Sequence, residues 1–501
     1  MENNTPFQTW DGGWQQPQEP MMFYTGKKEL VFGFFAVGFG LLMVNSVLFY
    51  GFSLGFALAM CGCILSSAGY LVWSGCRLDG YSGTLLGLSL VITAGFARSD
   101  DGFVKFMMLC FLTVSVDLGL CLLAGQARRA PGGAASLLDA PRSLWVMGVG
   151  RSGPALRGAR QSVKQGGAGA RRGGAVFVGL LLAGPLLMVV VPLLVSADAA
   201  FDGLLDQLPE MDLRELLGTL MFGVFAVIVI YARGVALKHS PKEPLARKEL
   251  RGMERLTVDT VLVLMSFVYL VYLFSQLAYF VGGFSGILPE EFTLAEYARR
   301  GFFEMTLLCM IDLGVIALAV GLVRKKDGKA PLSTRILCLW IGLMTVFFVV
   351  ASSAKMILYI DGYGLTRLRV LTEVITVFFG LSTVAVMIWL FAPKMPYMKV
   401  IMVMGLLIGA VVFWADVDTV VASYNVSAYQ SGKLETIDME YLDLQGNVAI
   451  PFAQKLLDDD DPMVAMRARA IVNRAKWMDR EPLDLREWNY PEWYLWKLGQ
   501  E

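Results

Sequence analysis

The chain has very little histidine and little charge for its length. His239 is the only histidine among 501 residues, and charged residues make up 17% of the chain, whereas soluble domains carry nearer a quarter. Zinc hydrolysis, histidine-dependent intramembrane proteolysis and histidine-based acyl transfer all need a histidine beside a nucleophile, a carboxylate or a metal. A single histidine in a basic loop argues against these enzyme classes. We therefore expect a protein that is not an enzyme, with no catalytic residue, no metal and no cofactor.

Cysteine is also absent from the part of the chain where disulfides would be expected. All seven cysteines lie in or beside apolar runs, and the segment after residue 416 holds none. This distribution argues against a disulfide framework. We interpret the cysteines as small apolar packing residues.

Apolar residues are abundant and arranged in long runs. The chain is 56% hydrophobic with a mean hydropathy of +0.57, and its runs have the length that a helix needs to cross a bilayer. A transmembrane barrel would show weaker, alternating segments. We predict an all-α, polytopic transmembrane helix bundle of about 11 spans with a small helical tail. The predicted spans are 30–49, 52–74, 83–97, 103–124, 175–195, 216–232, 258–281, 302–323, 336–358, 370–392 and 400–415.

Lysine and arginine are unevenly divided between the loops, and this division orients membrane helices. With the N-terminus inside, the cytoplasmic segments hold 26 basic residues and the short outer segments only seven. The opposite orientation would invert this ratio. Eleven crossings then place the C-terminal tail outside the cytoplasm, where it carries nine basic and sixteen acidic residues. We expect an N-terminus inside and a C-terminus outside.

The predicted spans divide the chain into five segments. The segment 126–174 is rich in glycine, alanine and arginine, with Asp139 as its only acid, and we expect a flexible basic cytoplasmic loop. Such a loop beside spans attracts anionic lipids. Nucleic acid is not expected as a partner, because Trp145 is the loop's only aromatic residue. The segments are a cytoplasmic N-terminus (1–28), spans one to four (29–125), the basic loop (126–174), spans five to eleven (175–416) and an acidic, helical extracytoplasmic tail (417–501).

Ionisable side chains inside the spans are few. Each is costly near the centre of a bilayer and is therefore a functional candidate. Lys355 could snorkel to the outer surface or pair with Asp312 or Glu373. Asp312 could be neutral, hydrogen-bonded between helices, or part of a wet cavity. The intramembrane polar candidates are Asp117, Asp312, Lys355 and Glu373.

Two of the predicted outer segments carry a pair of arginines at the start of the next span, and we call these segments the corners. In the elbow Gln276–Glu304, Thr293 and Glu296 have capping-box spacing, which predicts that a helix starts at Leu294. The segment 359–369 repeats the arrangement of an acid, glycines and two arginines. We expect these corners to receive the acidic tail; the alternative is that their arginines contact lipid phosphates. The corner arginines are Arg299, Arg300, Arg367 and Arg369.

Several short stretches resemble a known group of membrane proteins. The stretches are LLVSADAAF (193–201), QLAYFVGG (276–283), LAEYARRGFFE (294–304), DGYGLTRLR (361–369), SYNV (423–426) and DLREWN (484–489). With these motifs the chain resembles the bacterial multi-pass membrane proteins grouped as domain of unknown function 4173, with the related group 4153 as the close competitor. The resemblance implies a bacterial cell (plasma) membrane protein. It implies no activity and no catalytic residue.

Taken together, these features predict an integral membrane protein that acts as a non-enzymatic sensor, scaffold or accessory subunit. Its partners would be the lipid bilayer and another membrane protein. The alternative is a transporter in which Asp312, Lys355 and Glu373 line a polar path. A transporter would show broken helices and internal repeats, and the two arginine-bearing corners are the only repeat in the sequence.

Overall fold

A computed structural model describes most of the chain. The described residues are 23, 25–128, 134–165, 186, 190, 193–194, 213–241, 252–284, 302–325, 329–476 and 484–498. Within them, ten helices are long and apolar enough to cross a membrane. The chain is therefore an all-α, polytopic membrane protein, as predicted.

Ten of the eleven predicted spans correspond to these helices. The fifth predicted span, 175–195, lies almost wholly outside the described residues. The ten helices are α1 (Lys27–Asn45, extended by a π-helical turn to Tyr50), α2 (Leu54–Trp73), α3 (Gly80–Ala94, extended to Ala97), α4 (Gly102–Leu123), α9 (Leu213–His239), α10 (Arg255–Phe284), α12 (Phe302–Leu322), α13 (Leu332–Tyr363), α14 (Arg367–Phe391) and α15 (Tyr397–Ala415).

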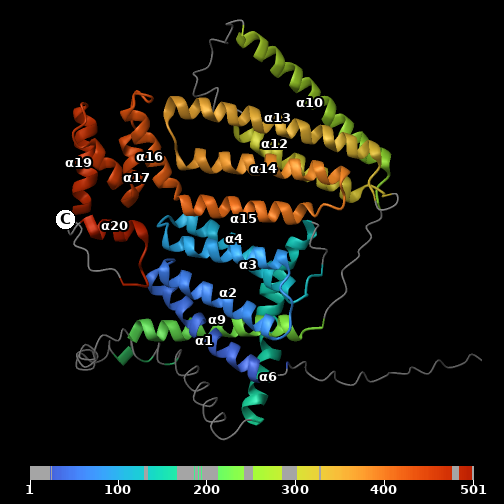
Figure 1. Ribbon diagram of the computed structural model, residues 1–501, viewed down its shortest axis with the longest axis vertical. Coiled ribbons are helices and arrows are strands. Elements are labelled where there is room, and N and C mark those ends of the chain that lie inside the picture. Colours follow the sequence, from blue (N-terminus) through green and yellow to red (C-terminus); the bar gives the residue numbers. More distant parts are fainter. Residues whose placement is uncertain are drawn as a thin grey trace, which may run out of the picture.

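The spans form two halves with separate apolar cores. The first half packs α1 to α4 and α9 around one cluster of buried side chains, and the second half packs α10, α12, α13 and α14 around another. Helix α15 lies between the halves (Figure 1) and contributes Leu406, Ala410 and Phe413 to the first core. We call these groups the first half and the second half.

Polar contacts fix which helix ends lie together. At one end, Lys28 Nζ donates to the carbonyl of Trp73 at 2.6 Å, and His239 Nε2 lies 3.0 Å from Glu29 Oε1. The start of α1 and the ends of α2 and α9 therefore meet there, and we call this the basic end. At the other end, the tail end, Asn45 Nδ2 donates to Glu215 Oε1 at 2.7 Å, so the end of α1 meets the start of α9.

The end of α4 and the start of α9 lie at opposite ends of the bundle. Helix α4 ends at the basic end, where the Gln126 side chain donates to the carbonyl of Ser240 at 2.8 Å. Helix α9 begins at the tail end. Helix α4 therefore ends at the opposite end of the bundle from the one at which α9 begins.

The segment expected to be a flexible loop contains helices, and this expectation was wrong for residues 134–165. These are η3 (Ala134–Leu138), α5 (Asp139–Arg142), the π-helical η4 (Ser143–Val149) and α6 (Ser152–Gln165). Ala140, Met147 and Ala155 are buried in the first core. Small residues and glycines made the segment resemble a linker, but they allow close packing: Gly148 lies where an added Cβ would be 3.1 Å from Val229.

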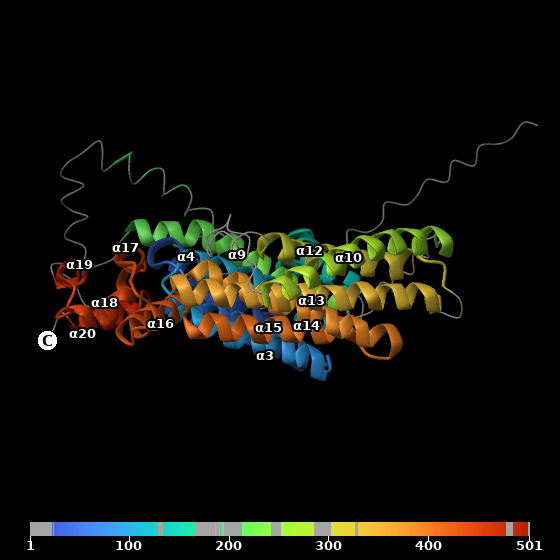
Figure 2. The same ribbon diagram turned by 90° about the horizontal axis from the view of Figure 1, so that it is seen from above.

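The tail forms a helical unit at the tail end (Figures 1 and 2). Its own apolar core includes Val426, Leu442 and Ala468. The helical tail agrees with the sequence pattern. Its elements are α16 (Val417–Gln430), α17 (Met439–Leu444), η5 (Gly446–Ala449), α18 (Ile450–Ala453), η6 (Gln454–Leu456), α19 (Pro462–Lys476) and α20 (Tyr490–Leu498).

Candidate functional site

An ion pair lies inside the first half. Arg233 Nη1 of α9 is 3.1 Å from Asp117 Oδ1 of α4, and the two side chains are 17% and 3% exposed. The sequence singled out Asp117 but assigned Arg233 to the following basic loop, because the apolar run weakens after residue 232. Helix α9 continues to His239, so Arg233 belongs to the membrane-spanning helix. A buried pair of this kind is costly to desolvate and marks a functional candidate.

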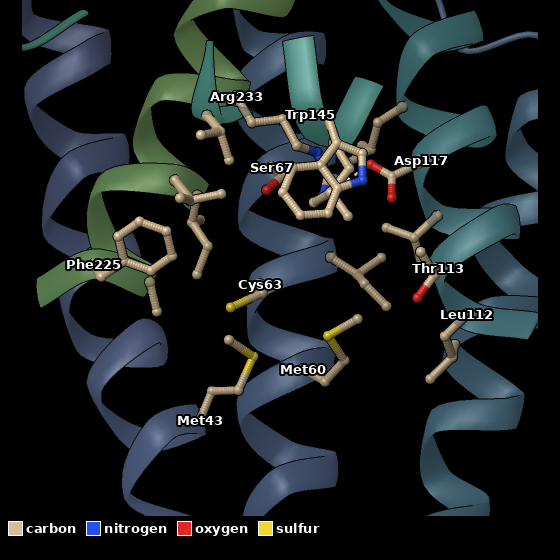
Figure 3. A pocket seen from close by; sticks show the side chains of 18 residues that line it. Met43, Met60, Cys63, Ser67, Leu112, Thr113, Asp117, Trp145, Phe225 and Arg233 are labelled. Carbon is tan, nitrogen blue, oxygen red and sulfur yellow. Dashed lines mark ion pairs between the residues drawn. The ribbon is translucent and has the colours of Figure 1, made fainter. Parts of the chain in front are cut away.

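The ion pair stands at one end of an apolar cavity of about 440 Å³. This volume is in the range of small-molecule pockets. Figure 3 shows Asp117 and Arg233 at one end and Met43 and Met60 at the other. The wall comes from α1, α2, α4, α9 and η4, and includes Cys63, Ser67, Leu112, Trp145, Phe225 and Ala226.

One oxygen of Asp117 faces Arg233 in the cavity without a well-aligned hydrogen bond from any described residue. Among the described residues, Asp117 Oδ1 is buried without a hydrogen-bond partner, although it is ion-paired with Arg233. An ionised carboxylate only accepts hydrogen bonds, and a guanidinium only donates them. The site therefore presents one acceptor and several donors side by side, in apolar surroundings.

The ion pair is close to the basic end of the bundle. Arg233 lies six residues before the end of α9 and Asp117 six residues before the end of α4, which is about 9 Å at the helical rise. Lys238, five residues beyond Arg233, donates to the carbonyl of Ser74. Lysines near the ends of membrane-spanning helices extend toward the headgroup level. The pair lies deeper in the bundle than Lys238, and the apolar cavity extends from it.

Trp145 covers the basic-end side of the cavity. It belongs to η4 and lines the cavity, yet its side chain is 64% exposed. The neighbouring Val146 is 45% exposed. Figure 1 shows α6 running across the direction of the spans. Helix α6 contacts η4 and carries Arg157 and Arg160. Exposed tryptophan beside a basic helix is typical of a segment at a membrane surface.

Asp312 of the second half has a different environment. Its side chain is fully buried, and its two oxygens accept hydrogen bonds from Tyr269 and Thr345. The bond from Thr345 is 2.8 Å long. These bonds link α12 to α10 and α13. Of the environments considered for Asp312, the structure has the hydrogen-bonded one between helices.

The other two intramembrane candidates lie elsewhere in the second half. Lys355 is on α13 and Glu373 on α14, and both are partly buried. Asp312 makes its bonds to Tyr269 and Thr345 rather than to Lys355 or Glu373. The structure therefore does not bring the three together as one hydrogen-bonded path within the described residues.

Arg367 joins the two halves and the tail. Its guanidinium makes two bonds to Asp418 of α16, at 2.8 and 2.5 Å, and lies 2.5 Å from Asp101 at the start of α4. Its backbone N–H donates to the hydroxyl of Tyr441 in α17 at 2.7 Å. Planar, bidentate contacts of this kind are the strong ones for arginine.

The turn beside Arg367 is shaped to hold the tail. Gly364 has φ +72°, and an added Cβ would stand 2.7 Å from Asn425 Oδ1. Asn425 of α16 accepts from the N–H of Leu365 at 2.7 Å and donates to its carbonyl at 2.9 Å. The predicted corner motif is therefore a docking turn for α16.

The remaining corner arginines are placed differently. Arg369 donates to the carbonyl of Tyr363 at 3.1 Å and its guanidinium stacks 4.0 Å from the ring centroid of Tyr359. It thus closes its own turn. Arg299 and Arg300, like the predicted helix start at Leu294, lie outside the described residues.

Arg486 is an anchor that the sequence analysis missed. It comes from the tail and enters the tail end of the first half, where Nη1 donates to Glu215 Oε1 at 2.6 Å and to Asn45 Oδ1 at 3.2 Å. The guanidinium also lies 3.9 Å from the centroid of the Tyr50 ring. We expected basic residues of the bundle to bind an acidic tail. Here, instead, a basic residue of the tail binds Glu215 and Asn45 of the bundle.

Asp484 holds Arg486 in place. Its carboxylate accepts from Arg486 Nη2 at 2.8 Å. The bonds from Arg486 lower the pKa of Asp484, and those from Asp484 raise the pKa of Arg486. The motif DLREWN, quoted above for the resemblance, contains both residues.

The single histidine has a structural partner. His239 Nε2 lies 3.0 Å from Glu29 Oε1, which also accepts from the hydroxyl of Tyr70 at 3.0 Å. Among the described residues no group of three or more histidine, cysteine, aspartate and glutamate side chains is placed to hold a metal ion.

Comparison with known proteins identifies a family. The family model described as "Domain of unknown function (DUF4153)" matches residues 31–456. The match begins in α1 and ends in η6, so it takes in the cavity and Arg367 but not Arg486. It corresponds to the second of the two groups suggested by the motifs, not to the first, 4173. No curated protein and no solved structure matches the chain.

Proposed function

We propose that this chain, which belongs to the DUF4153 family, is a non-enzymatic membrane protein of the sensor, scaffold or accessory class. In this proposal the tail is the part that meets a partner, and the bundle responds to or supports that contact. The orientation proposed from the charge pattern places the tail outside the cytoplasm and the basic end inside, in a cell membrane.

The observation that carries the proposal is the double attachment of the tail. Arg486 joins the tail to the first half through Glu215, and Arg367 joins it to the second half through Asp418. Arg367 also reaches Asp101 of the first half. A change in how the halves sit against each other would therefore act on both attachments, and a partner bound to the tail would act back on the halves.

The tail offers an exposed surface for such a partner. Leu444 is 80% exposed, Met466 57% and Met463 56%. Large apolar side chains at this exposure on a helical unit are typical of an interaction surface when they lie together. Arg467 and Glu440 form an exposed pair beside them at 3.0 Å.

Photocrosslinking in cells tests this proposal. A photoreactive amino acid at Leu444 should crosslink one defined membrane protein in the native chain. The Arg367→Ala variant, which loosens α16 and α17 by removing the bonds to Asp418, should lose most of that product. Arg255→Ala, which removes an exposed arginine paired with Asp259 within α10, is the matched control and should keep it. Equal crosslinking in all three, or no protein product at all, would contradict the proposal.

A further inference from the structure

The cavity at Asp117 and Arg233 has the features of a ligand site rather than of a packing defect. It is apolar except at one end, and there it presents a carboxylate oxygen, Asp117 Oδ1, that has no hydrogen bond within the described residues. Leaving a buried acceptor unsatisfied is unfavourable. Asp312 of the second half shows the usual solution, with a hydroxyl donor on each oxygen. In the first half, Asp117 is next to the guanidinium of Arg233 and the hydroxyl of Ser143, but within the described residues neither forms a well-aligned hydrogen bond to Oδ1.

The charges of the site select the kind of headgroup. Arg233 and Asp117 are 3.1 Å apart, so the pair has no net charge. An anionic headgroup drawn to Arg233 would be repelled by Asp117, and both interactions are strong in apolar surroundings. A headgroup with a hydroxyl and a carbonyl is neutral and complementary, because the hydroxyl donates to Asp117 and the carbonyl accepts from Arg233.

The position of the ion pair along the helices and the apolar lining of the cavity indicate what the rest of the ligand must be. The pair lies about 9 Å inside the ends of α4 and α9, which is below the level marked by Lys238. Away from the pair the wall is apolar, from Cys63 and Leu112 to Met43 and Met60 (Figure 3). Hydrocarbon chains fit these walls. Phe225 is 63% exposed and lines the cavity, so the cavity adjoins the outside of the bundle at membrane depth.

We propose that this cleft binds a neutral amphiphile from the bilayer, with one or two hydrocarbon chains and a hydroxyl next to an ester or acid carbonyl. Mono- and diacylglycerols and protonated fatty acids have this chemistry. The hydroxyl donates to Asp117 Oδ1, the carbonyl accepts from Arg233, and the chains lie along α2, α4 and α9. Trp145 covers the headgroup on the basic-end side.

Photolabelling of the purified full-length protein in lipid nanodiscs tests the proposal. A diacylglycerol and a fatty acid, each with a diazirine on the chain, are the two probes, and adducts are mapped by peptide mass spectrometry. Adducts should fall on the cavity walls within 60–67 and 225–230. Excess unlabelled diacylglycerol should reduce them at least tenfold, and phosphatidylglycerol should not. Preference for either hydroxyl-bearing probe supports the proposal and identifies the source of the ligand.

Variants separate the cavity from general lipid contact. Ala226→Trp fills the cavity, and Val229→Phe is a second, smaller filling variant; each should lower the cavity adducts at least tenfold. Asp117→Asn should lower the preference for the diacylglycerol probe over its O-methyl ether at least fivefold. Asp312→Asn is the matched control and should change neither value. Gel filtration identifies any variant that fails to fold.

Three results would overturn the proposal. The first is unchanged cavity labelling in both filling variants that fold. The second is equal labelling of the native protein by the diacylglycerol probe and its O-methyl ether, together with equal labelling by the fatty acid probe and its methyl ester. The third is competition by phosphatidylglycerol that is as strong as that by diacylglycerol. Arg486→Ala should leave the labelling unchanged, so failure of this proposal is distinguishable from failure of the proposed role of the tail.

Discussion

The two halves of the bundle each bury an aspartate in a transmembrane helix, but they satisfy it in different ways. In the second half Asp312 accepts one hydroxyl hydrogen bond on each oxygen, and those bonds join three helices. In the first half Asp117 is held by the charge of Arg233 and faces a cavity. The two hydroxyl donors satisfy both oxygens of Asp312 and hold the helices together. At Asp117, a charged partner and an adjoining cavity leave room for a ligand to form further hydrogen bonds.

The largest expected effect is at Arg233. Arg233→Met leaves Asp117 as a buried charge without its counter-ion, and the free energy of unfolding should fall by about 3–5 kcal/mol. Reversible unfolding in mixed micelles measures this change. The double variant Asp117→Leu/Arg233→Met removes both charges and should recover most of the loss. If the double variant is as unstable as the single one, the ion pair does not account for the stability of this site.

A smaller effect is expected at Asp312. Asp312→Ala removes the acceptor of two hydrogen bonds and should cost about 1–3 kcal/mol, because hydrogen bonds between membrane helices are worth about 0.6 kcal/mol on average and 1.7 at most. The same unfolding measurement applies. Tyr269→Phe and Thr345→Val each remove one bond and should together account for most of the loss. A loss as large as that of Arg233→Met would remove the distinction between the two halves.

The sequence predicts the class of the protein and most of its spans, because both depend on long apolar runs that are visible in one dimension. It also identifies Asp117 and Asp312, since a charge inside an apolar run stands out. It cannot tell them apart, because the difference lies in Arg233 and in Tyr269 and Thr345, which are distant in the chain. Arg233 is also hard to assign to a span from the sequence, because it lies at the end of an apolar run where the hydropathy falls.

The helical segment 134–165 illustrates a second limit. Glycine, alanine and arginine predict a linker when they are judged by propensity alone. In the structure, Met147 and Ala155 are buried against the first half. Burial depends on the surface that α9 presents, and no local property of the segment reports that surface.

The halves also differ in how they hold the tail, and Arg486 tests this difference. Arg486→Ala should loosen the tail from the first half at a cost of about 1–2 kcal/mol, because bonds to a charged partner are worth about 1.5–3 kcal/mol and this side chain is 36% exposed. Hydrogen exchange of residues 484–498 should rise, while exchange of α16, held by Arg367, should not. Arg467→Ala is the control, since its exposed pair is worth about 0–1 kcal/mol. A rise throughout the tail would mean that both attachments open together.

The smallest effect is a pH dependence confined to the attachment at Arg486. Hydrogen bonds from Arg486 hold the pKa of Asp484 below its ordinary value of 3.8, so the contribution of Asp484 is present above that value and is lost as the pH falls through the lowered pKa. Exchange of residues 484–498 should therefore be constant from neutral pH down to about 4 and rise only below it, after correction for the intrinsic rate. In Arg486→Gln the pKa returns toward 3.8, and any residual transition should move to higher pH. Arg486→Ala lacks the bonds to Asp484 and is the control. If residues 484–498 of Arg486→Ala show the same rise below about pH 4, the bonds between Arg486 and Asp484 do not account for the pH dependence.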